Sequence, residues 1–133
     1  MTPTSRAVLL EKFVLEHEGM TFDWAHRNCG HLIEDWANMV EGLGATVPPT
    51  RSQADTLRMI EARGGMEALV TEQLKRPSML PTLAQIGDVV LFENATLGIC
   101  NGRLSVCVSA SEGTVYKATE SALAAWPMGR EPK

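Results

Sequence analysis

The chain has 133 residues, of which 44% are hydrophobic, and carries a formal net charge of −4 at pH 7. This length suits a single domain with a substantial core, and the composition is that of a globular protein. The sequence has no basic stripe or Lys/Arg-rich arm, which argues against a nucleic-acid partner. No apolar run is long enough to span a bilayer, and we expect neither a membrane span nor a signal peptide.

The cysteines indicate the redox state of the chain. There are three of them, at irregular spacing and without a CxxC pair. An odd, irregular set favours reduced thiols over a disulfide framework, so we expect a protein made in a cytoplasm.

The first part of the chain, about 1–76, is predicted to be helical. Apolar residues at helical spacing, bounded by glycines and prolines, predict helices over 3–18, 29–43, 52–63 and 66–75. Asn28 is expected to cap the second helix, because its side-chain oxygen can accept a free backbone N–H of the first turn.

The second part, about 84–118, is predicted to form a small antiparallel sheet. The run Gly87–Phe92 indicates a strand buried on both faces, and Thr114–Ala118 indicates another. Thr119 could cap a short last helix that would run to Trp126. Helices followed by strands predict one α+β domain over 1–133.

Between these strands, Asn101-Gly102 separates two β-like runs and predicts a hairpin with a two-residue turn. That turn would place Cys100 opposite Arg103 and Thr96 opposite Cys107. Cys100 and Cys107 would share a face without being directly opposite, which argues against a disulfide between them.

Cys29 is the first candidate for chemistry, because it is expected at the first position of a helix. Free N–H groups and the helix dipole at such a position favour a thiolate and lower the pKa of a thiol. A nucleophilic role is therefore one interpretation. The other is a small buried residue beneath the helix, which is the usual place of a free cysteine and which the residues alone favour.

A catalytic thiol needs a base, and the residues near Cys29 offer one weak candidate. His31 follows by two residues, so on a helix the two side chains point about 200° apart. His26 lies in the preceding loop and could approach the sulfur, and Trp24 in the same loop could cover it. The histidines and cysteines do not have the spacing of a zinc site, so we expect neither a metal nor a cofactor.

Four stretches carry a resemblance when taken in order: FDWAHRNCGHLIEDWANMVEGLG, GGMEAL, AQIGDVVLFENATLGICNG and EGTVYKATESALAAW. Together they cover nearly the whole chain and resemble a family of short phage and prophage tail-module proteins. That family looks like a divergent branch of the NlpC-like cell-wall cysteine peptidases. The resemblance implies a papain-like fold, with the N-terminal helices packed on the sheet.

The resemblance also implies where a catalytic site would lie. Asn28-Cys29-Gly30 stands where the active peptidases have Asp-Cys-Ser, so Cys29 keeps the nucleophile position. Their His-Val-Gly-Ile-Tyr strand matches Thr96–Cys100, so the catalytic histidine falls on Thr96. Their third polar residue falls on the next strand, at Ser105 or Cys107.

Threonine at position 96 decides the function that we expect. A threonine hydroxyl cannot accept and return a proton near neutral pH as an imidazole does. Trp24, Thr96, Ser105 and Cys107 would then line a vestigial cleft.

The resemblance therefore implies a structural component of a phage tail tip or baseplate. It would be made in the bacterial host cytoplasm, located in the virion, and bound to the hub or the distal tail protein. Two alternatives stay open. One is an active cell-wall endopeptidase or amidase that acts on peptidoglycan with Cys29 and His26. The other is a cytoplasmic tail assembly factor.

Overall fold

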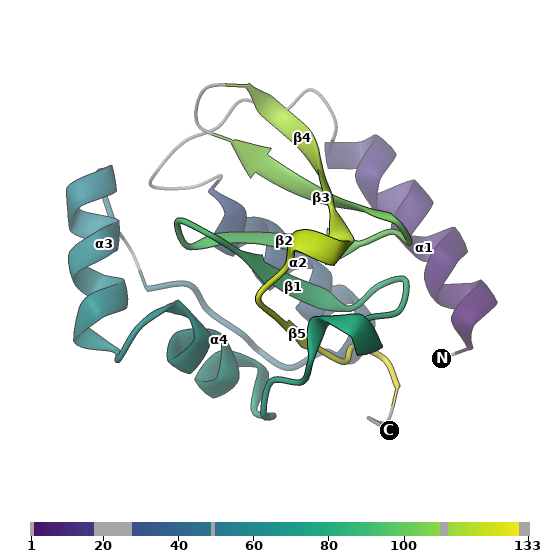
Figure 1. Cartoon of the computed structure of the whole chain (residues 1–133), viewed down its shortest axis with the longest axis horizontal. Helices are drawn as coiled ribbons and strands as arrows, with labels where there is room; N and C mark the ends of the chain where they lie inside the picture. Colours follow the sequence, from purple (N-terminus) through teal and green to yellow (C-terminus); the bar gives the residue numbers. More distant parts are fainter. Residues whose placement is uncertain (1, 18–27, 49, 110–111, 131–133) are drawn as a thin grey trace.

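A computed structural model describes residues 2–17, 28–48, 50–109 and 112–130 (Figure 1). The helices are α1 (Pro3–His17), α2 (Cys29–Glu41), α3 (Gln53–Ala62) and α4 (Met66–Leu74), with short 3-10 turns η1 (Pro81–Leu83) and η2 (Thr119–Ser121). The strands are β1 (Val89–Phe92), β2 (Thr96–Cys100), β3 (Leu104–Ser109), β4 (Gly113–Ala118) and β5 (Ala124–Trp126). The predicted α+β class is confirmed.

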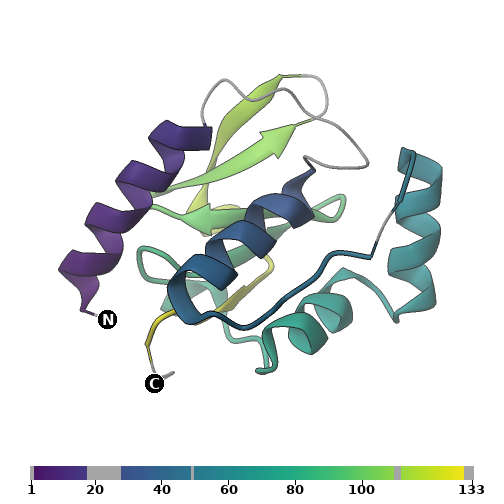
Figure 2. The same ribbon diagram turned by 180° about the vertical axis from the view of Figure 1, so that it is seen from behind.

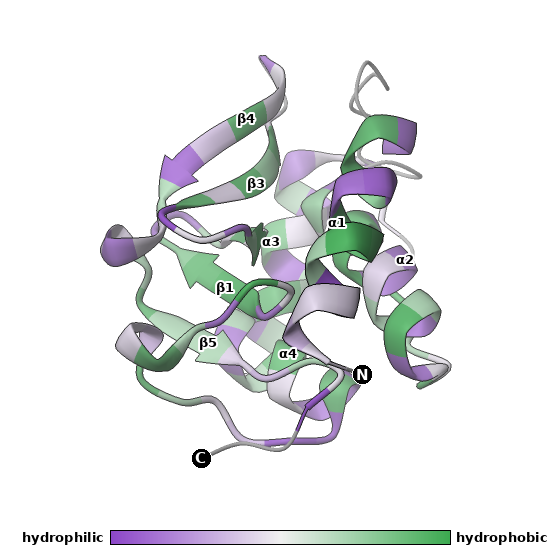
Figure 3. Cartoon of the chain, turned by 90° about the vertical axis from the view of Figure 1, so that its right-hand side faces the viewer, coloured by the Kyte–Doolittle hydropathy of each residue, from purple (hydrophilic) through white to green (hydrophobic). Residues whose placement is uncertain are grey.

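The strands form one antiparallel sheet in the order β4-β3-β2-β1-β5. Helix α2 crosses one face of the sheet beside α1, whereas η1 and η2 lie on the other side (Figures 2 and 3). The main core lies between helices and sheet and includes Phe13, Trp36 and Ile99. A smaller cluster on the opposite face includes Phe92 and Cys107.

Helix α2 begins as predicted. The side chain of Asn28 accepts from the backbone N–H of His31 at 3.0 Å, and the backbone N–H of Asn28 donates to Nδ1 of His31 at 3.4 Å. This capping box satisfies two backbone donors. At the other end, Gly42 takes a left-handed conformation, with φ of +62°, and its N–H donates to the carbonyl of Asn38. The helix therefore ends two residues before the predicted boundary at residue 43.

Strand β1 lies inside the sheet, between β2 and β5. All four of its side chains are buried, as predicted for Gly87–Phe92, and Figure 3 shows the strand coloured hydrophobic. The indole Nε1 of Trp36 donates to the carbonyl of Gly87 at 2.7 Å, which fixes α2 against the start of the strand. None of the described helices is long and apolar enough to cross a membrane.

The predicted register of the hairpin is wrong by two residues. Cys100 lies opposite Ser105, and Gly98 lies opposite Cys107, so four residues lie between the last paired residues of the hairpin, where two were predicted. The reason is tertiary: Thr119 donates from Oγ1 to the carbonyl of Gly102 and from its N–H to the carbonyl of Arg103. Side chains alternate between the two faces of a strand. A register shift of two residues therefore leaves the inward-facing side chains of the hairpin on the same face, except at the turn.

The predicted last helix over 119–126 is also wrong, and the sheet therefore extends beyond its predicted end at residue 118. Only the 3-10 turn η2 forms there, and β5 follows it as a strand beside β1. Without β5, the wholly apolar β1 would be an exposed edge. The buried indole of Trp126 donates to Oγ1 of Thr71 at 3.1 Å, which anchors β5 to α4.

Candidate functional site

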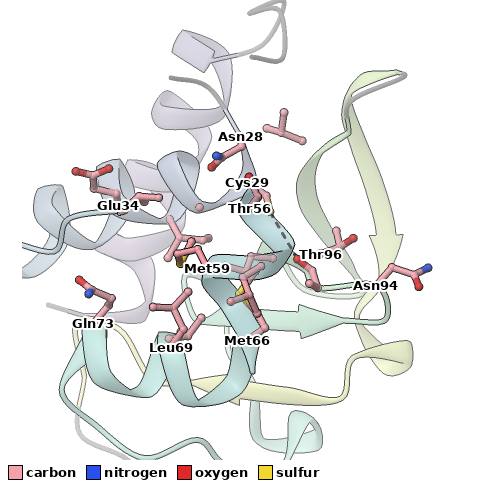
Figure 4. A pocket seen from close by; sticks show the side chains of 18 of the residues that line it. Asn28, Cys29, Glu34, Thr56, Met59, Met66, Leu69, Gln73, Asn94 and Thr96 are labelled. Atoms are coloured by element: carbon pink, nitrogen blue, oxygen red, sulfur yellow. Dashed lines mark hydrogen bonds between the residues drawn. The ribbon is translucent and has the colours of Figure 1, made fainter. Parts of the chain in front are cut away.

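A cavity of about 580 Å³ opens where the N-terminus of α2, the helices α3 and α4, and one end of β2–β4 meet (Figure 4). Met59, Met66 and Leu69 form part of its apolar wall. Glu34 from α2 and Gln73, which lies beside Leu69 on α4, add polar groups to the lining. A concave site with apolar walls and a few polar groups has the size and character of a binding pocket.

Cys29 is the first residue of α2 and lines this cavity. Its Sγ lies 3.9 Å from the carbonyl oxygen of Ala95, in the turn between β1 and β2 (Figure 4). Burial raises the pKa of the Cys29 thiol, and the smaller opposing effects come from the backbone N–H groups of Leu97, Cys29 and Gly30. The N–H groups at the helix terminus act in the expected direction, but desolvation outweighs them, so the arrangement fits the interpretation of Cys29 as an unreactive residue beneath the helix.

We expect Cys29 to react slowly with iodoacetamide at pH 7, more slowly than free cysteine. The reactive form is the thiolate, so a raised pKa moves the rise in rate to higher pH. Mass spectrometry of peptides from protein alkylated between pH 6 and 10 measures the rate at each cysteine separately. A rate that has already reached its plateau below pH 8 would contradict the raised pKa, and urea-unfolded protein gives the reference rate.

Thr96 lines the same cavity as Cys29. It opens β2, directly after Asn94 and Ala95, whose φ angles are +61° and +56°. The left-handed conformation of these two residues reverses the chain direction between β1 and β2. The Ala95 carbonyl therefore lies beside the Cys29 sulfur, and Thr96 is the next residue in the chain. The structure thus brings together the two positions that the resemblance pairs as nucleophile and base.

Ser105 and Cys107 lie elsewhere, and neither lines the cavity. The Ser105 hydroxyl lies 2.8 Å from Oγ1 of Thr119. Cys107 is buried in the smaller cluster, where burial above all, and then the nearby Cys29, raises its pKa to about 12. A Cβ at Gly98 would lie 2.6 Å from the Cys107 sulfur, so this glycine makes room for Cys107.

Ser109 is the residue on β3 that the sequence analysis missed. Extending the observed register by two residues places it opposite Thr96, and it lines the cavity. The predicted two-residue turn placed Cys107 opposite Thr96, whereas the longer turn of the structure places Ser109 there. A correct prediction of the turn length would therefore have identified Ser109.

The histidines in the described part of the chain have structural contacts away from the sulfur. His31 belongs to the cap of α2. His17 stacks on Phe13 with ring centroids 3.9 Å apart, and its Nε2 lies 3.4 Å from the carboxylate of Asp35. The proposed base His26 and the proposed cover Trp24 lie outside the described residues. Within the described ranges, no group of three or more His, Cys, Asp or Glu residues is placed to hold a metal ion.

The comparisons with known proteins give a family. No curated protein matches the chain. A family model described as a domain of unknown function (DUF6950) matches residues 4–128. Because this match runs from α1 through β5, the chain belongs to the DUF6950 family.

Proposed function

We propose that this chain is a structural component of a phage tail tip or baseplate, built on a degenerate papain-like peptidase plan. The observation that carries the proposal is the placement of Cys29 and Thr96 on one cavity. The resemblance assigns these positions to a nucleophile and a histidine. Finding both on one cavity supports the papain-like alignment, and finding threonine at the second supports a loss of catalysis.

The chemistry of the pair favours binding over acyl transfer. Burial raises the pKa of the Cys29 thiol and so keeps it protonated near neutral pH. The Thr96 hydroxyl cannot remove that proton, so the thiol has no base on the strand where the active peptidases carry theirs.

The cavity itself supplies a docking surface. Met59 and Met66 on its wall are unbranched and adaptable, and such side chains fit varied apolar partners. The partner proposed from the resemblance is the tail hub or the distal tail protein, and the chain would reside in the virion. In this proposal the cavity binds a neighbouring tail protein.

We expect a Cys29→Ala phage to assemble and infect like the parent, because the proposed role needs the cavity and not the thiol. Mass spectrometry of purified virions should detect the chain in both. A Met59→Glu variant places a charge on the cavity wall and should lower incorporation, while the isolated variant stays folded by circular dichroism.

Three outcomes would overturn the proposal. The chain could be absent from purified virions, as an assembly factor would be. The purified protein could clear a peptidoglycan zymogram and lose that activity in Cys29→Ala. A folded Met59→Glu chain could also incorporate at the parental level, which would remove the docking role of the cavity.

A further inference from the structure

The segment that follows β5, residues 127–130, is held by charged side chains. The carbonyl of Pro127 accepts from Nη1 of Arg76 at 2.7 Å. The N–H of Met128 donates to Oδ1 of Asp88 at 3.0 Å, and the N–H of Gly129 donates to Oε2 of Glu41 at 2.7 Å. We call residues 127–130 the strap.

Two ion pairs complete these contacts. Arg130 on the strap donates to the fully buried carboxylate of Asp88, with Nη2 and Oδ2 2.6 Å apart. Arg76 donates to both oxygens of Glu41, at 2.7 and 2.6 Å. The strap is therefore tied to α2 through Glu41 and to the start of β1 through Asp88.

The other charged and titratable groups around the strap are also placed. The buried guanidinium of Arg6, from α1, donates to the carbonyls of Ile86 and Gly129 at 3.1 and 3.4 Å. The Cys100 thiol on β2 is within electrostatic reach of Asp88 and Arg130. The carboxylates of Glu41 and Asp88 thus lie near three guanidinium groups, and Arg76 binds both oxygens of Glu41 directly.

The neighbouring strand is held differently. Strand β5 pairs with β1 through a backbone ladder, and Ala125 also exchanges backbone hydrogen bonds with Met79 at 2.8 and 3.1 Å. Backbone amides do not titrate in the acid range, whereas carboxylates do. The strap and β5 are adjacent in the chain, but acid can weaken the hydrogen bonds of the strap to carboxylates and not the backbone ladder of β5.

We propose that the strap is an acid-sensitive latch, which opens as a local unit when the carboxylate of Glu41 is protonated, while the sheet stays folded. Opening uncovers Met128, whose side chain is fully buried when the latch is closed. Local openings of this kind, below the free energy of global unfolding, are common in proteins.

The direction of the pH effect follows from Glu41. The Arg76 hydrogen bond above all, with help from the Gly129 N–H, holds the pKa of the Glu41 carboxyl below its usual range, against the opposing effect of burial. A carboxyl with a lowered folded-state pKa stabilises the closed form above its unfolded pKa. That contribution is lost as the pH falls through the folded-state pKa.

Amide hydrogen exchange followed by NMR on the full chain tests the latch. The intrinsic exchange rate divided by the measured rate, at pH 7 and at pH 3.5, gives protection factors for Met128 and Gly129 on the strap. We expect both to fall several-fold in acid. A glutamate with an unfolded pKa of about 4.3 can contribute at most about sevenfold at pH 3.5. The ladder amides of β1 and β5 should fall less.

A pair of variants separates the latch from general acid destabilisation. Glu41→Gln keeps the shape but removes the charge, so Gly129 should lose protection already at pH 7 and respond less to acid. Glu72→Gln removes a carboxylate of an exposed pair with Arg63 and should leave the strap unchanged. The proposal is overturned if strap and ladder amides lose protection together, or if Glu41→Gln leaves the response of Gly129 as it is in the parent.

Discussion

Replacing Asp88 with alanine is expected to lower the free energy of unfolding by roughly 3–5 kcal/mol, the cost of removing one partner of a buried ion pair. The carboxylate accepts from the backbone N–H groups of Gln85 and Met128 as well as from Arg130. Alanine would leave a guanidinium that is only 10% exposed without its counter-charge, and two backbone donors without their acceptor. Urea unfolding followed by circular dichroism measures the loss.

Two further variants sharpen this result. Asp88→Asn keeps an oxygen for the N–H groups but not the charge, and should therefore cost clearly less than alanine. Glu120→Ala removes an exposed carboxylate from η2 and should change the free energy by less than about 0.5 kcal/mol. A loss below about 1 kcal/mol in Asp88→Ala would show that the buried pair contributes little to holding the sheet and the C-terminal strap together.

The helices could be predicted because their signals are local. Asn28 caps α2 with its own side chain, and Gly42 ends the helix with a backbone conformation that glycine adopts readily. The four buried side chains of β1 likewise form a continuous apolar run that the sequence displays directly. Each of these features depends on residues within a few positions of one another.

The hairpin turn and β5 could not be predicted, because distant residues determine them. Thr119 holds Gly102 from seventeen positions away and overrides the expected two-residue turn. The segment that forms β5 is short and rich in alanine, so its own propensity does not favour a strand. It becomes a strand because β1 offers it an unpaired edge, and the hydrogen bond from Leu123 to Leu91 starts the pairing.

The candidate site was predicted in part. The resemblance paired Cys29 with Thr96 across 67 positions, and both line the cavity. The sequence left two interpretations of Cys29 open, because the position of a residue at a helix terminus can be inferred from sequence but its desolvation by the rest of the fold cannot. The third polar position was missed at Ser109 because the register depends on Thr119.

Installing a histidine at the position of Thr96 is expected to speed alkylation of Cys29 at pH 7 by about tenfold. A cysteine beside an imidazolium is stabilised as the thiolate, and such pairing lowers a thiol pKa by several units. The gain in thiolate is partly offset, because nucleophilicity falls as the pKa falls. Iodoacetamide kinetics of Thr96→His, with peptide mass spectrometry to separate Cys29 from Cys100 and Cys107, measure the change.

Thr96→Gln is the matched control, since it adds a polar side chain of similar reach that cannot titrate. It should leave the Cys29 rate near that of the parent. In the histidine variant the rate should fall only below the lowered thiol pKa, as the thiolate takes up a proton from solution. In a loosened fold it would already fall below the pKa of a free cysteine, about 8.5. Equal rates in the histidine and glutamine variants would place position 96 outside the reach of the sulfur. The papain-like alignment of the site would then lose the pairing on which it rests, whereas a histidine-specific gain would identify Thr96 as the position of a lost catalytic base.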